Sequence, residues 1–168
     1  MTVDSTIAAL QQAFPGDQVI LPGTEQYEAR NGSYQAKQES DLQPGCIFQP
    51  KRKEDVCEFI KIIKQFSGDG GLGFAIRAAG NMPAPGCANI QGGITLDLGL
   101  LDKVDFENGI ASIEAGAYWG KVNETVQAAG LGVVGGRSSH GGIGGLALAG
   151  KSIRQCLKNL KSDLASLI

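Results

Sequence analysis

Two glycine-rich segments carry the residues of this chain that could hold a ligand. The first loop, residues 77–82, reads RAAGNM, and the second loop, residues 135–145, reads GGRSSHGGIGG. Each follows a short apolar run. Because glycine lacks a Cβ and allows positive φ, backbone amides in such loops can approach phosphate or carbonyl oxygens closely. The two loops together favour a site that cradles a dinucleotide.

Composition narrows the class of protein. The 168 residues, 42% apolar and 19% charged, fit one soluble globular domain with a real core. Of the 25 glycines, 21 lie between residues 68 and 150, the segment that contains both loops. The glycine excess is therefore concentrated around the candidate ligand-binding loops. The net charge of −2, with a single short basic run at residues 51–53, predicts neither nucleic acid nor an anionic membrane as partner.

Cysteine usage and the N-terminus bear on metal binding and location. Cys46, Cys57, Cys87 and Cys156 are widely separated and the chain has one histidine, so we expect free thiols and no metal site. The first residues lack the basic and apolar regions of a signal peptide, and no apolar stretch approaches the ~20 residues that span a bilayer. These features predict a soluble, cytoplasmic protein.

Hydrophobic periodicity predicts the elements that position the loops, in a mixed α+β order. The first half gives a helix over 4–13, a lead-in without regular structure over 23–43, a strand over 46–50 and a helix over 54–66. In that last helix Val56, Phe59, Ile60 and Ile63 form one apolar stripe.

The second half is predicted to feed both loops from strands. A strand over 74–78 enters the first loop, a strand over 94–98 follows, and strands over 104–106 and 110–114 form a hairpin at Asn108-Gly109. A helix over 118–129 with Trp119, Val122, Val126 and Ala129 on one face ends at Gly130. A strand over 131–134 enters the second loop.

Residues 151–168 differ from the rest because they contain no glycine. Apolar residues at spacings of four and three predict an amphipathic helix: Ile153, Leu157, Leu160, Leu164 and Leu167. The stripe is short for a coiled coil, so we expect packing against the same domain, with self-association as the alternative.

Two other glycine patterns compete with the loops. Residues 68–73 fit GxGxxG, but they lie between a predicted helix and a strand, which reverses the order of a dinucleotide-binding unit. Residues 145–152 fit a Walker A pattern, but the preceding segment is polar and not a buried strand. A Walker-type nucleotide binder remains an alternative.

Four motifs carry a family resemblance. They are FAIRAAGN at 74–81, GCANIQGGITLDL at 86–98, AGAYWG at 115–120 and GVVGGR at 132–137. In order and spacing this set resembles the FAD-linked oxidoreductases of the berberine-bridge-enzyme and vanillyl-alcohol-oxidase type, in particular those of fungal secondary metabolism. The resemblance runs from about residue 46 to residue 150.

The resemblance implies an α+β fold, the N-terminal FAD-binding domain of the p-cresol methylhydroxylase and vanillyl-alcohol-oxidase type. It divides the chain into an N-terminal helix and lead-in over 1–43, a partial FAD-binding domain over 44–150 and a divergent C-terminal helix over 151–168. Family members continue into further FAD-domain strands and a substrate domain. The chain is therefore expected to be C-terminally truncated.

The resemblance also implies a set of cofactor-binding residues, the first group around the phosphates and the second along the flavin. They are Arg77, Ala78, Ala79, Gly80, Asn81 and Met82, then Ser138, Ser139, His140, Gly141, Gly142, Gly144 and Gly145. Asn81 stands where many relatives attach FAD through histidine, and Ser138 where some use cysteine. Since neither side chain is a comparable nucleophile, FAD is expected to bind non-covalently.

By the same resemblance, the parent chemistry is oxidation of a small organic substrate, of the kind made in secondary metabolism. The substrate would give a hydride to FAD, and oxygen would be the final acceptor. No residue of the chain is assigned as catalytic. The alternative function is a non-catalytic remnant or accessory module of such an enzyme.

Overall fold

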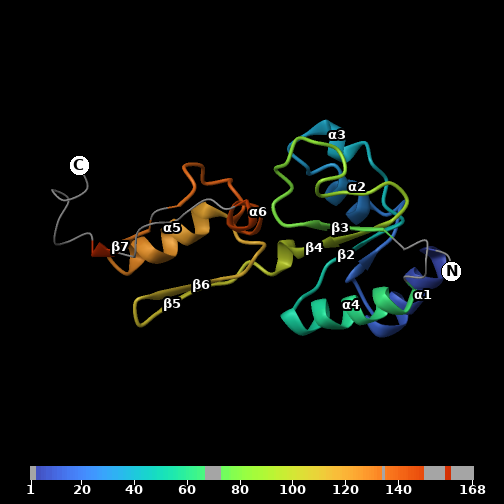
Figure 1. The fold of residues 1–168 in the computed structure, drawn as a ribbon, viewed down its shortest axis with the longest axis horizontal. Coiled ribbons are helices and arrows are strands. Elements are labelled where there is room, and N and C mark those ends of the chain that lie inside the picture. Colours follow the sequence, from blue (N-terminus) through green and yellow to red (C-terminus); the bar gives the residue numbers. More distant parts are fainter. Residues whose placement is uncertain (1–2, 67–72, 134, 150–157, 160–168) are drawn as a thin grey trace.

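The computed structural model describes residues 3–66, 73–133, 135–149 and 158–159. Figure 1 shows two parts side by side, a sheet with helices on both faces and a smaller part that holds a hairpin. The mixed α+β fold predicted from the sequence is confirmed. The two parts matter because the first loop leaves the larger one and the second loop belongs to the smaller one.

The larger part is built on a four-stranded sheet in the order β1-β2-β4-β3. Its strands are β1 (Val19–Ile20), β2 (Cys46–Phe48), β3 (Phe74–Arg77) and β4 (Ile94–Asp97). Strand β4 runs parallel to both β2 and β3, whereas β1 is antiparallel to β2. The carboxyl ends of the three parallel strands therefore share one edge, which is where ligands bind in open α/β sheets.

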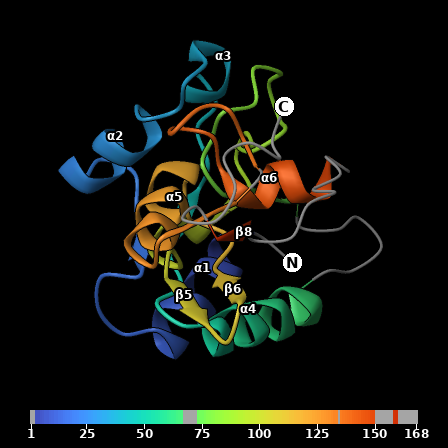
Figure 2. The same cartoon turned by 90° about the vertical axis from the view of Figure 1, so that its left-hand side faces the viewer.

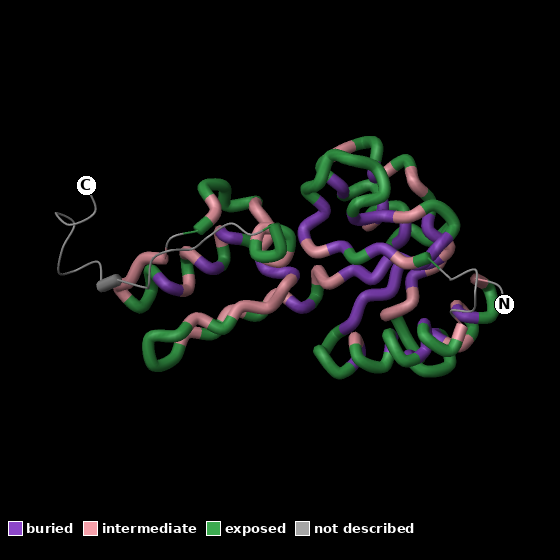
Figure 3. Tube along the Cα trace, viewed as in Figure 1, coloured by how far each residue is buried: buried purple, intermediate pink, exposed green. Residues whose placement is uncertain are grey.

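Helices cover both faces of this sheet, as Figure 1 shows. On one face α1 (Val3–Ala13) and α4 (Lys53–Phe66) bury Leu10 and Phe59 against Phe48. On the other face α2 (Glu25–Asn31) buries Tyr27 against Ile20 and Ile47. Figure 3 shows the resulting concentration of buried residues on the sheet, while the hairpin of the smaller part is mostly half-buried or exposed.

The interpretation of residues 23–43 as a lead-in without regular structure is wrong. This stretch forms α2 and the short helix α3 (Lys37–Ser40). Thr24 caps α2 by accepting a hydrogen bond from the backbone N–H of Tyr27 at 3.2 Å. Asn31, also buried, donates to the carbonyl of Ser40 at 2.9 Å. A polar cap, Thr24, and a buried polar amide, Asn31, hold this stretch in place. Because both are polar residues, they add nothing to an apolar period, and the helices could not be recognised from the sequence.

The apolar stripe predicted on α4 is right for Phe59 and Ile63 and wrong for Ile60, which is 42% exposed. Ile62 takes its place in the core, and Phe66 packs against the same cluster. Residues 59, 62, 63 and 66 follow the i, i+3, i+4, i+7 pattern of a buried helix face. The buried face is therefore rotated from the predicted one, because Ile62 and not Ile60 points into the core.

The smaller part begins after β4 with the short 3-10 helix η1 (Leu98–Leu100). The hairpin of β5 (Val104–Glu107) and β6 (Ile110–Ile113) is confirmed, and its turn residues Asn108 and Gly109 have φ of 52° and 79°. Two positive φ values are typical of a type I′ turn. Helix α5 (Trp119–Ala128) runs alongside the hairpin in Figure 1 and lies above it in the turned view of Figure 2, with Trp119, Val122 and Val126 buried.

The structure describes only two residues, 158 and 159, of the helix that the sequence predicts over 151–168. Lys158–Asn159 form β8, which pairs antiparallel with β7 (Leu131–Gly132), so the helix predicted over 151–168 is wrong at that point. The exposed edge of β7 offers backbone groups that a strand can satisfy and a helix cannot. The remainder of 151–168, and with it the proposed packing or self-association, lies outside the described residues.

The competing glycine patterns fall partly outside the structure. Of residues 68–73 only Gly73 is described, and Lys151 and Ser152 of the Walker-like pattern are not. Its described part, Gly145 onward, lies in α6 (Ile143–Leu148), whereas a P-loop wraps phosphate with that segment. The described residues therefore do not support the Walker alternative. Within them, no helix is long and apolar enough to cross a bilayer.

Candidate functional site

A cavity of about 720 Å³ lies where the two loops meet. That size is within the range of about 300–1,000 Å³ seen for small-molecule sites. Six predicted residues line it: Ala79, Asn81, Ser138, Ser139, His140 and Gly141. Six further residues complete the lining: Ser33, Gln35, Tyr118, Gly120, Lys121 and Glu124. The structure thus brings both loops, about 60 residues apart in the chain, to one site.

The first loop needs glycine at its centre. Gly80 has a φ of +71°, and a Cβ there would lie 2.9 Å from both Arg77 Nε and Tyr34 Cδ1. The carbonyl of Gly80 accepts a hydrogen bond from the backbone N–H of Gln35 at 3.2 Å. A side chain at this position would therefore be strained and would push the loop off its support.

The second loop rests on the start of α5. The backbone N–H groups of Trp119 and Gly120 donate to the carbonyls of Gly141 and Ser139, each at 2.9 Å. Gly135 and Gly136 lie flat on the indole of Trp119, where added Cβ atoms would come within 2.1 Å and 2.3 Å of the ring. These glycines allow the loop to lie against an aromatic ring, which explains part of the glycine excess.

The two loops also contact each other directly. Asn81 Nδ2 donates to the carbonyl of His140 at 2.7 Å. A Cβ on Gly142 would lie 2.4 Å from the Cβ of Ala79, so the loops pack at the closest distance that glycine permits. The lining residues therefore belong to one continuous wall.

The other predicted residues lie behind or beside this wall. Seven of them do not line the cavity: Arg77, Ala78, Gly80, Met82, Gly142, Gly144 and Gly145. Within the first loop Arg77 and Gly80 are buried, whereas Met82 is exposed. A direct role in binding remains a prediction for all thirteen residues.

Sequence reasoning missed half of the lining. Ser33 and Gln35 come from the segment interpreted as a lead-in, and only the packing of α2 on the sheet brings them to the first loop. No local pattern marks them. Tyr118 and Gly120 could have been found, because they lie in the AGAYWG motif that carried the family resemblance.

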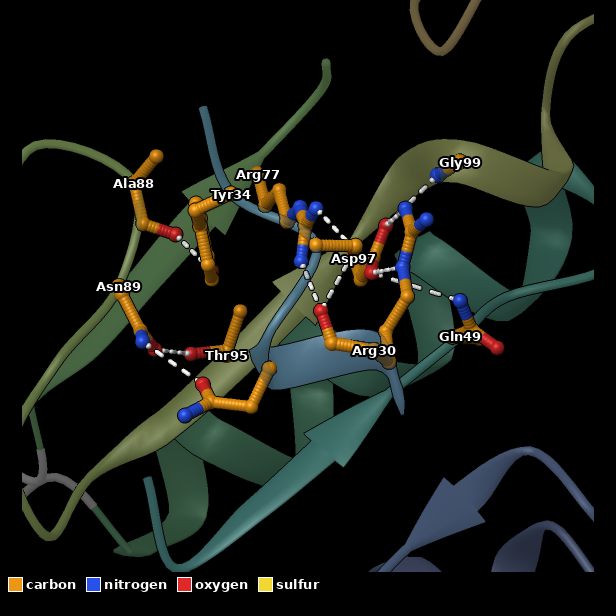
Figure 4. A network of polar contacts seen from close by, with 11 residues as sticks. Arg30, Tyr34, Gln49, Arg77, Ala88, Asn89, Thr95, Asp97 and Gly99 are labelled. Carbon is orange, nitrogen blue, oxygen red and sulfur yellow. Dashed lines mark hydrogen bonds and ion pairs between the residues drawn. The ribbon is translucent and has the colours of Figure 1, made fainter. Parts of the chain in front are cut away.

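A buried polar network at the carboxyl edge of the sheet fixes the base of the first loop (Figure 4). The carboxylate of Asp97, which has no exposed surface, accepts hydrogen bonds from Arg30 and from the backbone N–H of Gly99, the latter at 2.9 Å. Gln49 is a third donor residue, with Nε2 3.3 Å from the carboxylate. Burial lowers the pKa of Arg30, but the hydrogen bond and charge of Asp97 outweigh it, so that the pKa is raised overall.

The far end of the loop region is fixed by a second set of contacts. Tyr34 donates its hydroxyl to the carbonyl of Ala88 at 2.8 Å, and burial raises the pKa of Tyr34. Asn89 Oδ1 accepts from Thr95 at 2.8 Å, and its amide donates to the Asn31 side chain at 3.0 Å. These contacts hold residues 88–89, which follow the first loop in the chain, while the Asp97 network holds the carboxyl edge of the sheet that the loop leaves.

The residues present fit a dinucleotide cofactor. The wall offers glycine backbone, three serine hydroxyls and one imidazole, and a Cβ on its glycine Gly141 would lie 3.2 Å from the carbonyl of Ser138, so the loop backbone itself forms the lining there. Lys121, the one lysine in the lining, forms an ion pair with Asp102 at 2.8 Å. Backbone and neutral polar groups of this kind suit a long ligand with phosphate and carbonyl oxygens, and Glu124 is the one carboxylate in the lining.

Known proteins share this architecture. A family model described as FAD binding domain matches residues 44–164. A FAD-dependent monooxygenase, FUP4 of Fusarium proliferatum, is 40% identical over 119 residues, which cover 70% of this chain and 22% of that protein. The chain spans less than a third of the length of this relative.

Two solved structures are similar in fold. That of 6-hydroxy-D-nicotine oxidase from Arthrobacter nicotinovorans has a TM-score of 0.64 at 25% identity and covers 77% of this chain and 27% of its own. That of the Physcomitrella patens protein BBE-like 1 has a TM-score of 0.67 at 20% identity, over 88% of this chain and 30% of its own. The second likeness concerns the fold alone.

Proposed function

This chain belongs to the FAD binding domain family, and from that premise we propose that the cavity between its two loops holds FAD non-covalently for oxidation of a small organic substrate. The membership confirms the family, the fold type and the cofactor that the sequence predicts. The site residues, the mode of attachment and the reaction are the proposal.

One observation carries it. Two glycine-rich loops, one at the end of β3 and one on α5, form a single cavity wall joined by the hydrogen bond from Asn81 to His140. A long cofactor has two ends to hold, and the loops supply one support for each. In this proposal the first loop carries the phosphates and the second lies along the flavin.

The proposed mode of attachment follows from the side chains on the wall. Asn81 has a delocalised amide nitrogen, and Ser138 has a hydroxyl that is far less nucleophilic than a thiolate. Neither is suited to form a bond to the flavin. His140 lies in the lining with its Nδ1 3.1 Å from the Ser139 hydroxyl, a pair that can bind cofactor oxygens.

The proposed reaction rests on the relatives. Bound FAD would supply the redox chemistry, taking a hydride from the substrate and passing the electrons to oxygen. The residues of this chain bind and orient the cofactor. The relative FUP4 is named as a FAD-dependent monooxygenase, which supports FAD-dependent chemistry that uses oxygen. The organic substrate of the secondary-metabolite kind is what the sequence resemblance implies.

A spectrum and an acid precipitation test the proposal. We expect purified protein, reconstituted with FAD and passed over a desalting column, to keep a flavin absorption band. On acid precipitation the flavin should stay in the supernatant. Colourless protein after reconstitution would contradict FAD binding at this site, and flavin retained in the precipitate would contradict the non-covalent mode.

A further inference from the structure

We infer that Arg77 is a buried counter-charge for the diphosphate of the bound dinucleotide, and that it acts from behind the first loop without touching the ligand. The inference rests on the proposed function and deepens it, since it says what selects an anionic cofactor. It makes Arg77 a positioning residue.

The first step is that Arg77 is buried and that its hydrogen-bond and ring partners are neutral groups. The residue is 1% exposed, with Nη1 2.7 Å from the carbonyl of Arg30, Nη2 2.8 Å from Ser33 Oγ and its guanidinium 3.7 Å from the centre of the Tyr34 ring. Its Nε has no hydrogen-bond partner among the described residues. Within that same part of the chain, no carboxylate accepts a hydrogen bond from Arg77.

The second step is the charge of the network in Figure 4. It contains two guanidinium groups, Arg30 and Arg77, and one carboxylate, Asp97, which is bonded to Arg30. One positive charge is thus left without a counter-charge in the network. Burial and the neighbouring charge of Arg30 lower the pKa of Arg77, as expected for a cation in such a place. Burying a charge without a partner is costly, so a partner supplied by a ligand would be strongly favoured.

The third step is the position of the guanidinium. It lies directly under Gly80, whose absent Cβ would approach Arg77 Nε within 2.9 Å and Nη2 within 3.2 Å. The residues on either side of Gly80, Ala79 and Asn81, line the cavity, and so does Ser33, the hydrogen-bond partner of Arg77. Only the thin backbone of the loop separates the charge from the cavity.

These three steps imply a positive electrostatic potential at the cavity wall beside the first loop. A charge acts over several ångströms in a buried setting, where the effective dielectric constant is well below that of water. Lys121, the cation that does face the cavity, is already paired with Asp102. The unpaired buried charge therefore favours ligands with phosphate over neutral ones, which means FAD over riboflavin.

The sharpest test places a carboxylate beside Arg77. Ser33 is exposed, so Ser33→Asp should fold, and it would neutralise the guanidinium that Ser33 now binds. Ser33→Asn has the same shape without the charge. We expect Ser33→Asp to bind FAD about 10- to 100-fold more weakly than Ser33→Asn, with riboflavin affinity alike in both.

A second pair of variants removes the charge itself. Arg77→Gln should lower FAD affinity by a similar factor, about 10- to 100-fold, and leave riboflavin affinity within about threefold. Arg52→Gln, at an exposed arginine paired with Asp55, is the matched control and should bind both ligands as wild type does.

The outcomes separate the inference from the proposed function. If the wild-type protein binds neither FAD nor riboflavin, the proposed function itself is contradicted. If wild type binds FAD and Ser33→Asp matches Ser33→Asn, or if both flavins weaken equally, the counter-charge inference is overturned. This comparison does not depend on whether Arg77→Gln folds.

Discussion

Asn81 is the residue that joins the two loops of the site. Its side-chain amide joins the first loop to the carbonyl of His140 in the second, at 2.7 Å. The residue is exposed, so the hydrogen bond contributes to the shape of the cavity wall more than to the stability of the fold. Its loss should therefore be visible in binding.

Asn81→Ala should weaken FAD binding about 2- to 10-fold, the net worth of one hydrogen bond, with little change in melting temperature. Asn81→Asp, which keeps the shape but turns the donor into an acceptor facing a carbonyl, should weaken it further. Fluorescence titration of FAD against the three proteins measures the effect. Equal affinity in Asn81→Ala and wild type would mean that the bridge between the loops is not used.

The cysteines make a second prediction at this scale. Burial raises the pKa of the Cys46 thiol to about 12, while Cys57 and Cys87 are exposed. Because the thiolate is the reactive form and a raised pKa removes it near pH 8, native protein treated with a thiol reagent should be modified at Cys57 and Cys87 and spared at Cys46. Peptide mapping by mass spectrometry reads this directly. Modification of Cys46 at the rate of the exposed pair would contradict its burial in the core.

At the scale of elements, the packing of one loop on the other can be altered sterically. A Cβ on Gly142 would lie 2.4 Å from the Cβ of Ala79, while the φ of −79° at Gly142 is open to any residue. Gly142→Ala should therefore separate the loops at a cost of about 1–3 kcal/mol and lower FAD affinity accordingly.

The compensating change is the control for this prediction. The double variant Ala79→Gly with Gly142→Ala moves the methyl group from one loop to the other, and it should recover most of the FAD affinity lost in Gly142→Ala. Titration of all three proteins under the same conditions makes the comparison. No recovery in the double variant would show that contact with Ala79 is not the cause.

Helix α2 begins at a side-chain cap. Thr24 Oγ1 accepts from the backbone N–H of Tyr27, so Thr24→Ala should lower the free energy of unfolding by about 1 kcal/mol. Thr24→Ser keeps the hydroxyl and should stay near wild type. Urea unfolding curves of the three proteins measure the free energies of unfolding. A Thr24→Ala curve that overlays the wild-type curve would mean that the cap contributes nothing to stability.

The same helix shows where sequence reasoning stops. The hairpin and the strands before and after the first loop were predictable, because alternation and the Asn-Gly turn are local signals. Helix α2 was not, since its buried residues are Tyr27 and Asn31, and an asparagine breaks an apolar period. Asn31 is buried where the side-chain amide of Asn89, 58 residues away, donates a hydrogen bond to its Oδ1, and this partner is set by the tertiary fold.

At the scale of the whole molecule, the site is a junction between two parts of the fold. The sheet presents the first loop at its carboxyl edge, and α5 presents the second. The motifs of both loops identified the family from sequence, but Ser33 and Gln35 reach the cavity only through the docking of α2 on the sheet. These two positions of the wall are therefore a product of packing between elements that are separate in the sequence.

The most direct test of the central claim is a calorimetric titration of FAD into flavin-free protein, with a thermal melt before and after. The account predicts saturable heat for one FAD per chain, and a melting temperature that rises with FAD concentration because ligand binds only the folded state. Protein with the circular dichroism of an α+β fold that gives no heat and no rise in melting temperature would contradict it.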